Sequence, residues 1–457
     1  MPHTNIVQKL RDKKSFTYMA YMVLKSKLFS SGILFISSII IIRAIPKDDY
    51  GLYVLVMIFF GFFELLLGGL DHSITRFVPK VGKIEQHKII STVIFIKTII
   101  VILILFSLLF LYGFSKEILN IPIEKYSTYE KLYYITTLSF IFKYLTTTAL
   151  RIINSYMLYG VLLKLTILNS SATLIICIII SLFDLNIWQY ASAMVGFAFV
   201  YSIISIYAVS AQKKISLSAL QSFMNINTVR ITARKQIIPY SLPLFGVGVL
   251  SFVKNNLPGY LFGAMVSLEM LATYNIFKKL TGFLHKGYDG FIQSLYPKLF
   301  SLIDSKSRAI EKFFKLGFLV RLSVFIVLYF SYSEILDMYK IKEEEYDFVI
   351  FLVLISSFLI LYFGSFFNLI IMSKFRTFQI FKSSILRNLS FLFFSYFLFS
   401  IYGTIGLIVA IFLDGIITSN ILYYYFCKVI DNRMYFFIYY GTIILLTSAL
   451  VPIIYLL

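Results

Sequence analysis

Long apolar blocks alternate with short polar stretches along the whole chain. Each block is about 17 to 25 residues long, which at 1.5 Å per residue spans the ~30 Å hydrocarbon core of a bilayer as an α-helix. The blocks are solid, whereas the strands of a membrane β-barrel would show alternating segments of about ten residues. The pattern therefore predicts about thirteen transmembrane helices. The predicted spans are residues 24–43, 50–70, 89–112, 132–152, 160–182, 187–209, 236–256, 268–286, 314–332, 347–372, 384–401, 404–426 and 435–456.

A long basic stretch between the sixth and seventh predicted spans divides the chain into two halves. We expect an all-α integral membrane protein with an N-terminal six-helix bundle in residues 1–209 and a basic cytoplasmic linker in 210–236. A C-terminal six-helix bundle in 237–426 and an extra C-terminal transmembrane helix in 427–457 complete the prediction. An alternative interpretation has one span fewer, with a peripheral last helix.

The two halves share a faint internal repeat. Its motifs in the first half are Arg43-Ala44-Ile45-Pro46, Asp49-Tyr50-Gly51-Leu52-Tyr53 and Phe77-Val78-Pro79-Lys80; in the second half they are Gly263-Ala264, Glu269-Met270-Leu271-Ala272-Thr273-Tyr274 and Leu295-Tyr296-Pro297-Lys298. Corresponding positions lie about 220 residues apart, and six predicted spans separate them, so the repeat is parallel. Transporters often hold their substrate at the interface between such repeats. Chance similarity between two aromatic-rich helices is the alternative.

The charge distribution predicts the orientation. Only 14% of the residues are charged and 59% are apolar, with a net charge of +20, whereas a soluble chain is ~25% charged. The linker carries Lys213, Lys214, Arg230, Arg234 and Lys235 but no acid, and residues 342–347 form an acidic loop. Basic loops mark the cytoplasmic side, so we expect a cytoplasmic N-terminus and no removable signal peptide. This asymmetry explains the basic charge without a nucleic-acid partner.

Several charged side chains fall within the predicted spans, where each costs ~2.5–3.5 kcal/mol at mid-membrane. Lys97, Lys254 and Arg321 lie within about two turns of a helix end, so we expect their long side chains to reach the interface. Others lie too deep for this. These are Lys143, Lys278, Lys279, Glu64 and Asp414.

The deep charges have polar or small neighbours at helical spacing. Lys143 shares a face with Thr136, Ser139 and Thr147, and Lys279 and Lys278 lie one turn from Asn275 and Tyr274. One interpretation is a cationic cavity for an anionic group, because lysine binds phosphate as a point charge. Glu64 and Asp414 would then take a coupling ion. The alternative is that these acids and bases pair and lock helices together.

Motifs for enzymatic chemistry are absent from the sequence. There is no G-x-x-x-x-G-K-[ST] phosphate loop, no H-E-x-x-H and no G-x-S-x-G, which argues against nucleotide hydrolysis, metalloprotease chemistry and a serine hydrolase. The two cysteines, Cys177 and Cys427, and the scattered histidines make no metal spacing. We expect no metal site and no cofactor, apart from H⁺ or Na⁺ as a coupling ion.

The order of motifs along the chain resembles that of the Wzx-type polysaccharide flippases of the multidrug/oligosaccharidyl-lipid/polysaccharide exporter superfamily. The resemblance rests on residues 43–52, on Gly69-Leu70-Asp71-His72-Ser73-Ile74-Thr75-Arg76-Phe77, on Thr273-Tyr274-Asn275 through Lys279-Leu280, and on Tyr296-Pro297-Lys298. It implies translocation of an undecaprenyl-diphosphate-linked oligosaccharide repeat unit, such as that of O-antigen or lipopolysaccharide, by ion-coupled alternating access. The extra last helix departs from the even number of spans usual in that family.

Two candidate site sets follow from these residues and the resemblance. The substrate-binding set of the cationic cavity is Lys143, Lys278, Lys279, Asn275, Tyr274, Lys254 and Arg321. The ion-coupling or gating set is Glu64, Asp414, Asp71 and Arg76. The expected partners are the undecaprenyl-diphosphate-linked glycan and membrane lipid, with other polysaccharide-assembly proteins as further candidates.

The resemblance implies a multi-pass protein of the bacterial inner membrane that is a transporter and no enzyme. Three alternatives stay open: a multidrug exporter of the same superfamily, a membrane-embedded oligosaccharide polymerase, and a flippase for peptidoglycan precursors. Drug exporters move organic cations and should have an acidic cavity, whereas the charged residues within the predicted spans here are mainly basic. Polymerases carry a large outside loop with arginine and histidine, and the predicted outside loop at 113–131 has neither.

Overall fold

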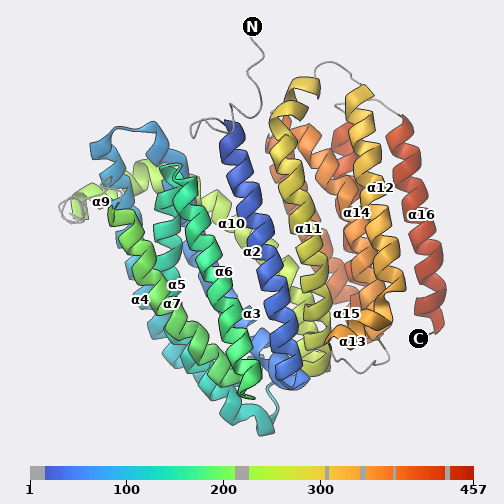
Figure 1. Ribbon diagram of the computed structural model, residues 1–457, viewed down its shortest axis with the longest axis horizontal. Helices are drawn as coiled ribbons and strands as arrows, with labels where there is room; N and C mark the ends of the chain where they lie inside the picture. Colours follow the sequence, from blue (N-terminus) through green and yellow to red (C-terminus); the bar gives the residue numbers. More distant parts are fainter. Residues whose placement is uncertain are drawn as a thin grey trace. The chain divides into compact units, whose positions relative to one another are not determined.

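The computed structural model describes residues 16–211, 226–303, 308–339, 346–373, 377–427 and 433–456, and every regular element in these ranges is helical (Figure 1). The chain forms two compact units. The first comprises residues up to Phe252 together with Gly263–Glu269, and the second comprises Val253–Phe262 and the chain from Met270 onward. The predicted boundaries at 209, 236 and 426 stay predictions, and most of the linker lies outside the described residues.

The first unit is built from long helices that run side by side (Figure 1). They are α2 (Phe16–Ala44), α3 (Lys47–Phe77), α4 (Lys83–Ile118), α5 (Tyr126–Ser155), α6 (Tyr159–Leu182) and α7 (Ile187–Ala211), followed by the short α9 (Ile226–Thr232), a π-helical turn (Ala233–Ile237) and the first part of α10 (Ile238–Leu261). Within this unit α2 packs on α6, and α5 packs on both α3 and α7. Acidic residues start α3 and Arg76 ends it, which complements the helix dipole.

The second unit contains the rest of α10 and the remaining helices. They are α11 (Leu268–Ile303), whose first two residues belong to the first unit, α12 (Arg308–Phe330), α13 (Tyr332–Tyr339), α14 (Asp347–Ser373), α15 (Thr377–Cys427) and α16 (Arg433–Leu456). The central helix α14 packs against α12, α15 and α16. Gly403 divides α15 into two arms because its φ of 56° and ψ of −131° are not helical, and glycine adopts positive φ without steric cost.

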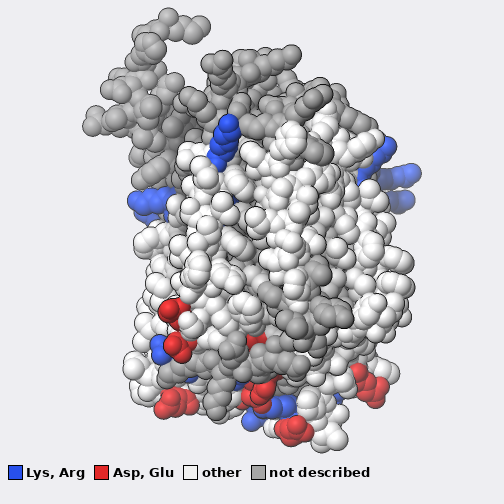
Figure 2. Space-filling view, turned by 90° about the vertical axis from the view of Figure 1, so that its right-hand side faces the viewer, with Lys and Arg blue, Asp and Glu red and all other residues white. Residues whose placement is uncertain are grey.

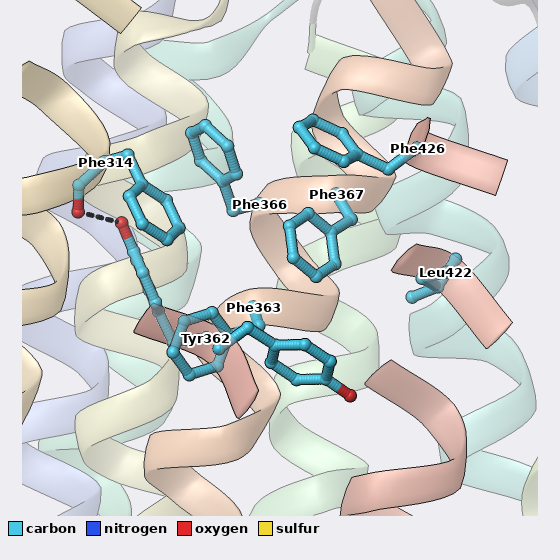
Figure 3. Close-up of a cluster of buried hydrophobic side chains, with 8 residues drawn as sticks. Phe314, Tyr362, Phe363, Phe366, Phe367, Leu422 and Phe426 are labelled. Carbon is cyan, nitrogen blue, oxygen red and sulfur yellow. Dashed lines mark hydrogen bonds between the residues drawn. The ribbon is translucent and has the colours of Figure 1, made fainter. Parts of the chain in front are cut away.

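An aromatic cluster forms the core of the second unit (Figure 3). Its buried members come from α12, α14, α15 and α16: Phe314, Tyr362, Phe363, Phe366, Phe367, Leu422, Phe426 and Tyr439. The Tyr362 hydroxyl donates a hydrogen bond of 2.6 Å to the carbonyl oxygen of Phe314. Buried aromatic rings pack edge to face or offset, and a buried tyrosine hydroxyl needs a partner such as this carbonyl.

The predicted spans all lie on helices, but the helix ends differ. α4 continues to Ile118 and α5 begins at Tyr126, so most of the predicted outside loop at 113–131 is helical. The predicted spans 384–401 and 404–426 are the two arms of α15. The predicted span at 268–286 lies on α11, whose first part is largely buried, as at Leu271 and Phe277.

Length and composition alone qualify six helices of the described residues as membrane spans, or seven when the bent pair α12–α13 counts as one. The described chain is therefore a multi-pass membrane protein, while the number thirteen and the cytoplasmic N-terminus stay predictions. On the face shown in Figure 2 the visible acidic side chains gather toward one end. Lys213, Lys214 and the acidic residues 343–345 lie outside the described residues.

Candidate functional site

Lys143 and Glu64 form an ion pair between α5 and α3 in the first unit. The Lys143 Nζ atom lies 2.6 Å from the Glu64 Oε1 atom. The two side chains are 35% and 41% exposed, so another charged group can approach either of them. The sequence predicted both residues as site candidates, and the structure brings them together.

Beside this pair the first unit contains a cavity of about 410 Å³. The predicted polar face of α5 lines it, because Thr136, Ser139, Lys143 and Thr147 all contribute. Helices α6 and α7 add Thr166, Asn169 and Tyr201. Hydroxyl and amide side chains are hydrogen-bond partners for sugar hydroxyls, while the ammonium group supplies a site for an anion.

A second ion pair of the first unit is fully enclosed. The Lys97 Nζ atom lies 2.6 Å from the Asp71 Oδ1 atom and donates a hydrogen bond of 2.7 Å to Thr148 Oγ1. The Lys97 side chain is 0% exposed and the Asp71 side chain 4%. The expectation that Lys97 reaches the interface is therefore wrong, because a nearby carboxylate and hydroxyl satisfy its charge inside the bundle. The role of Asp71 in ion coupling stays a prediction.

The second unit has its own charged cluster at Lys254 of α10 and Asp414 of α15. The Lys254 Nζ atom lies 2.8 Å from the Asp414 Oδ1 atom, with side-chain exposures of 13% and 18%. Thr418 joins the pair, since it accepts a hydrogen bond from Lys254 and donates one to Asp414, each 3.3 Å long. Lys254 thus pairs within the unit, and the expectation that it extends to the interface is wrong.

Arg387, one arm earlier in α15, belongs to the surroundings of this cluster and was missed by the sequence analysis. The charge of Asp414 acts on Arg387, whose guanidinium donates hydrogen bonds to the Ser383 carbonyl and the Ser384 hydroxyl. It was missed because it lies within one turn of the start of the predicted span 384–401, where a basic residue is easily assigned to the preceding loop.

The neighbouring lysines of α11 differ in their surroundings. Lys278 donates a hydrogen bond of 2.5 Å to the Asn255 carbonyl and lies 5.4 Å from the ring centroid of Tyr274. Tyr274 is buried and packs against Phe262, whereas Lys279 is exposed and Asn275 is half-buried. Successive residues point in different directions on a helix, so the two ammonium groups do not act at one point.

Arg321 of α12 is a packing residue and does not extend to the interface. Its side chain is buried, and its Nη1 atom donates a hydrogen bond of 2.6 Å to the Phe358 carbonyl. The guanidinium lies 4.5 Å from the centroid of the Phe358 ring and within 3.1 Å of His285 Nδ1. The expectation of an interfacial Arg321 is wrong, because aromatic faces and a backbone carbonyl stabilise the charge internally.

The last candidate, Arg76, is exposed at the end of α3. Its guanidinium carbon lies 4.2 Å from the centroid of the Tyr240 ring of α10.

Within the described residues, no three His, Cys, Asp or Glu side chains come close enough to hold a metal ion. Of the two interpretations of the deep charges, pairing is confirmed for Lys143 with Glu64 and for Lys254 with Asp414. A half-exposed pair can still bind a ligand.

Comparison with known proteins connects this geometry to a family. Residues 19–303 match the sequence model described as "Polysaccharide biosynthesis protein". A sequence comparison with curated proteins finds none that matches.

Three solved structures have a similar fold. The lipid II flippase MurJ in an inward closed conformation matches with a TM-score of 0.67 and 16% identity over 94% of this chain and 92% of that chain. An inward-facing multidrug resistance MATE family transporter of the MOP superfamily gives 0.64 and 12% over 90% and 98%. A MOP superfamily transporter from Pyrococcus furiosus, described by the reverse polarity of its binding pocket, gives 0.63 and 13% over 94% and 99%. The neighbours are transporters and flippases, and the likeness shows that the fold is theirs.

Proposed function

Since this chain belongs to the polysaccharide biosynthesis protein family, we propose that it moves an undecaprenyl-diphosphate-linked oligosaccharide repeat unit across the bacterial inner membrane. The protein acts as a secondary transporter and carries out no covalent chemistry. The lipid carrier crosses with its polyprenyl chain in lipid, while the glycan and the diphosphate need a polar path.

The cavity beside the Lys143–Glu64 pair is the observation that carries this proposal. Its lining combines one ammonium group with hydroxyl and amide side chains from α5, α6 and α7. A glycan offers many hydroxyl groups, and a diphosphate offers negative charge, so both parts of the substrate find partners there. The half-exposed state of the pair lets a phosphate approach Lys143 without first unfolding a buried contact.

Coupling to an ion follows from competition for Lys143. When Glu64 is ionised it holds the Lys143 ammonium, and when it binds a proton or sodium ion that ammonium is released for the substrate phosphate. Substrate and ion then favour the same state, and by linkage each raises the affinity for the other. The ion then leaves the cytoplasm with the substrate, and the inside-negative membrane potential acting on the anionic diphosphate drives export. Return of the carboxylate charge restores the pair and expels the phosphate.

The second unit supplies the other members of the predicted set. Within the second unit Lys278 and Lys279 are separate candidate ligands for anionic groups, and the Lys254–Asp414 pair offers a second carboxylate for a coupling ion. Transport proceeds by alternating access of the site to the two sides of the membrane, as in other transporters built from repeats.

Deletion of the gene in its host tests the proposal. Lipid-linked oligosaccharides are extracted and surface polysaccharide is stained in wild-type, deleted and complemented cells. Loss of surface polysaccharide with complete repeat units accumulating on the carrier is expected. Single units that reach the periplasm would indicate the polymerase, and intact polysaccharide with new sensitivity to cationic drugs would indicate the drug exporter. A block in cell-wall synthesis would indicate the peptidoglycan-precursor flippase.

Complementation with variants tests the site itself. The combined change Lys143→Ala, Lys278→Ala and Lys279→Ala should abolish export although the protein still inserts into the membrane. The matched control changes three exposed lysines outside the site, Lys83, Lys131 and Lys164, to alanine and should export normally. Normal export by the first variant would overturn the cationic site.

A further inference from the structure

The first unit has a second hollow, an apolar groove of about 530 Å³ along α3, α4 and α10. None of the described residues that line it is charged. Leu70 and Ile104 are buried at its base, while Leu103 and Leu242 are mostly exposed at its edges. An apolar groove on a membrane-spanning helix bundle lies against hydrocarbon and holds lipid, because water gains no partners there.

The groove has a defined length and direction. On α4 its lining runs from Ile96 to Ser107, which is about 16 Å along the helix axis. On α10 it covers the first two turns, from Ile238 to Phe245. It therefore extends from mid-membrane toward the end at which α3 stops and α10 begins, the end that the charge pattern assigns to the cytoplasm.

Close contacts between α3 and α10 continue from the groove to that end. A Cβ atom on Gly69 would lie 3.3 Å from the Phe245 Cβ atom, so the two helices touch at the groove. One turn further on, the Ser73 and Ser241 hydroxyls are hydrogen-bonded at 2.6 Å. The line ends at Arg76, whose guanidinium covers the ring of Tyr240. An apolar groove thus leads directly to an exposed cation.

The charge at this end is mainly positive. Arg234 and Lys235, in the turn that precedes α10, are exposed as well. The acid on this side of the groove, Glu85, is bound by Lys88 at 3.6 Å and by Gln236 at 3.4 Å. Arg76 thus faces the headgroup region with its charge available for an anion such as phosphate.

We infer that this groove binds the polyprenyl chain of the diphosphate lipid carrier, with the diphosphate at Arg76, an inference that rests on the proposed function. The groove with its cationic end complements an amphiphile that has one long hydrocarbon chain and one strongly anionic head. A phospholipid would place one of its two chains here and leave the other in bulk lipid. The groove would retain the carrier at the membrane face where its glycan is assembled.

Binding of undecaprenyl diphosphate without sugar tests the inference. The full-length protein is placed in phosphatidylcholine nanodiscs, and a photoreactive group on the isoprene units nearest the diphosphate reports the position of that part of the chain. Crosslinks are expected on α3, α4 and α10 along the groove. Crosslinks confined to other helices, or no binding by the wild type, would overturn the inference.

Two variants and two matched controls locate the site. Ser107→Trp fills the groove and Arg76→Gln removes the head contact; each should weaken binding about tenfold, as loss of one charge-assisted or well-packed contact does. Arg76→Lys should restore part of the affinity because it keeps the charge. Leu109→Trp on the lipid-exposed face of α4 and Arg43→Gln at the end of α2 should bind normally. Unchanged binding in both groove variants would contradict the inference.

A lipid competition experiment and a transport assay distinguish the remaining outcomes. Excess phosphatidylglycerol should not displace the carrier, and equal competition would make this an ordinary phospholipid groove and overturn the inference. Transport of complete lipid-linked oligosaccharide is measured in parallel with the same wild-type protein. Carrier binding in the groove without transport would refute the proposed function alone, whereas transport with unaltered binding in the variants would refute the groove alone.

Discussion

Lys97 of α4 and Asp71 of α3 form a 2.6 Å ion pair that is enclosed on all sides within the first unit. Thr148 of α5 accepts a further hydrogen bond from the ammonium group, so one cation connects three helices. Tyr144 adds its ring face at 5.2 Å. A charge taken out of water in this way is stable only while its partners stay in place.

Lys97→Met is therefore expected to lower the stability of the protein by about 3–5 kcal/mol, because it leaves the Asp71 carboxylate buried and unpaired. Thermal unfolding of the detergent-solubilised protein measures the change. The double variant Lys97→Met/Asp71→Leu should recover most of the loss, since an apolar pair of similar size avoids the desolvation cost.

The control for this prediction is the half-exposed pair of Lys88 and Glu85, whose atoms lie 3.6 Å apart. Lys88→Met should change stability by at most ~1 kcal/mol, as is usual for surface pairs. Equal effects of Lys88→Met and Lys97→Met would show that the buried pair has no special structural role.

Gly51, in the first turns of α3, touches the backbone of Leu268. A Cβ atom at position 51 would lie 1.9 Å from the Leu268 carbonyl oxygen. Gly51→Ala must therefore displace backbone, and we expect a loss of about 1–3 kcal/mol, as for other overpacking changes. The melting temperature measures it.

Gly113→Ala on α4 is the matched control, because nothing lies within 4 Å of the Cβ atom that it would add. Alanine is a better helix former than glycine by about 0.5–1 kcal/mol, so this variant should melt at a higher temperature. The melting temperature should fall for Gly51→Ala and rise for Gly113→Ala. A stabilised Gly51→Ala variant would show that Gly51 does not lie against the Leu268 backbone.

The helices could be predicted from the sequence because length and apolarity are local properties of each segment. Their ends could not, since α4 and α5 continue past the hydrocarbon as polar helix to Ile118 and from Tyr126. The burial of the first part of α11 could not be predicted either, because it depends on the neighbouring helices that cover Leu271 and Phe277.

The candidate site was predictable along single helices but not between them. Helical spacing placed Thr136, Ser139, Lys143 and Thr147 on one face, and all four line the cavity. Spacing could not reveal that Lys143 pairs with Glu64, because the partner lies on another helix. For the same reason Lys97 and Arg321 were expected at the interface, although tertiary partners hold both inside.

Lys125, in the short turn between α4 and α5, binds both Asp48 and Asp49 at the start of α3. Burial lowers the pKa of Lys125, but its hydrogen bonds to the two carboxylates outweigh this and raise the pKa above the usual lysine value. A raised lysine pKa stabilises the folded state at every pH below the unfolded value of about 10.4. That stabilisation is lost as the pH rises through the folded pKa.

Lys125→Gln should consequently lower the melting temperature by a constant amount near neutral pH, with the difference from wild type shrinking above about pH 10.4. Melting curves from pH 7 to the alkaline limit of the detergent, at about pH 11, measure it. Lys131→Gln, at an exposed position in the second turn of α5, controls for the loss of charge. A difference that persists unchanged at the highest pH would show that packing of the side chain, and not its charge, stabilises this turn.

The Lys254 ammonium and a coupling ion would compete for the single carboxylate of Asp414. If the carboxylate couples transport, Asp414→Asn should abolish the dependence of transport on a proton or sodium gradient while substrate exchange continues. Lys254→Met should instead keep the dependence and shift it to lower ion concentration, since the competing ammonium is gone. Transport into proteoliposomes with and without each gradient measures both effects. A pair that only locks α10 to α15 would respond equally to the two substitutions, with the same loss of melting temperature and of activity, and that result would remove Asp414 from the coupling mechanism.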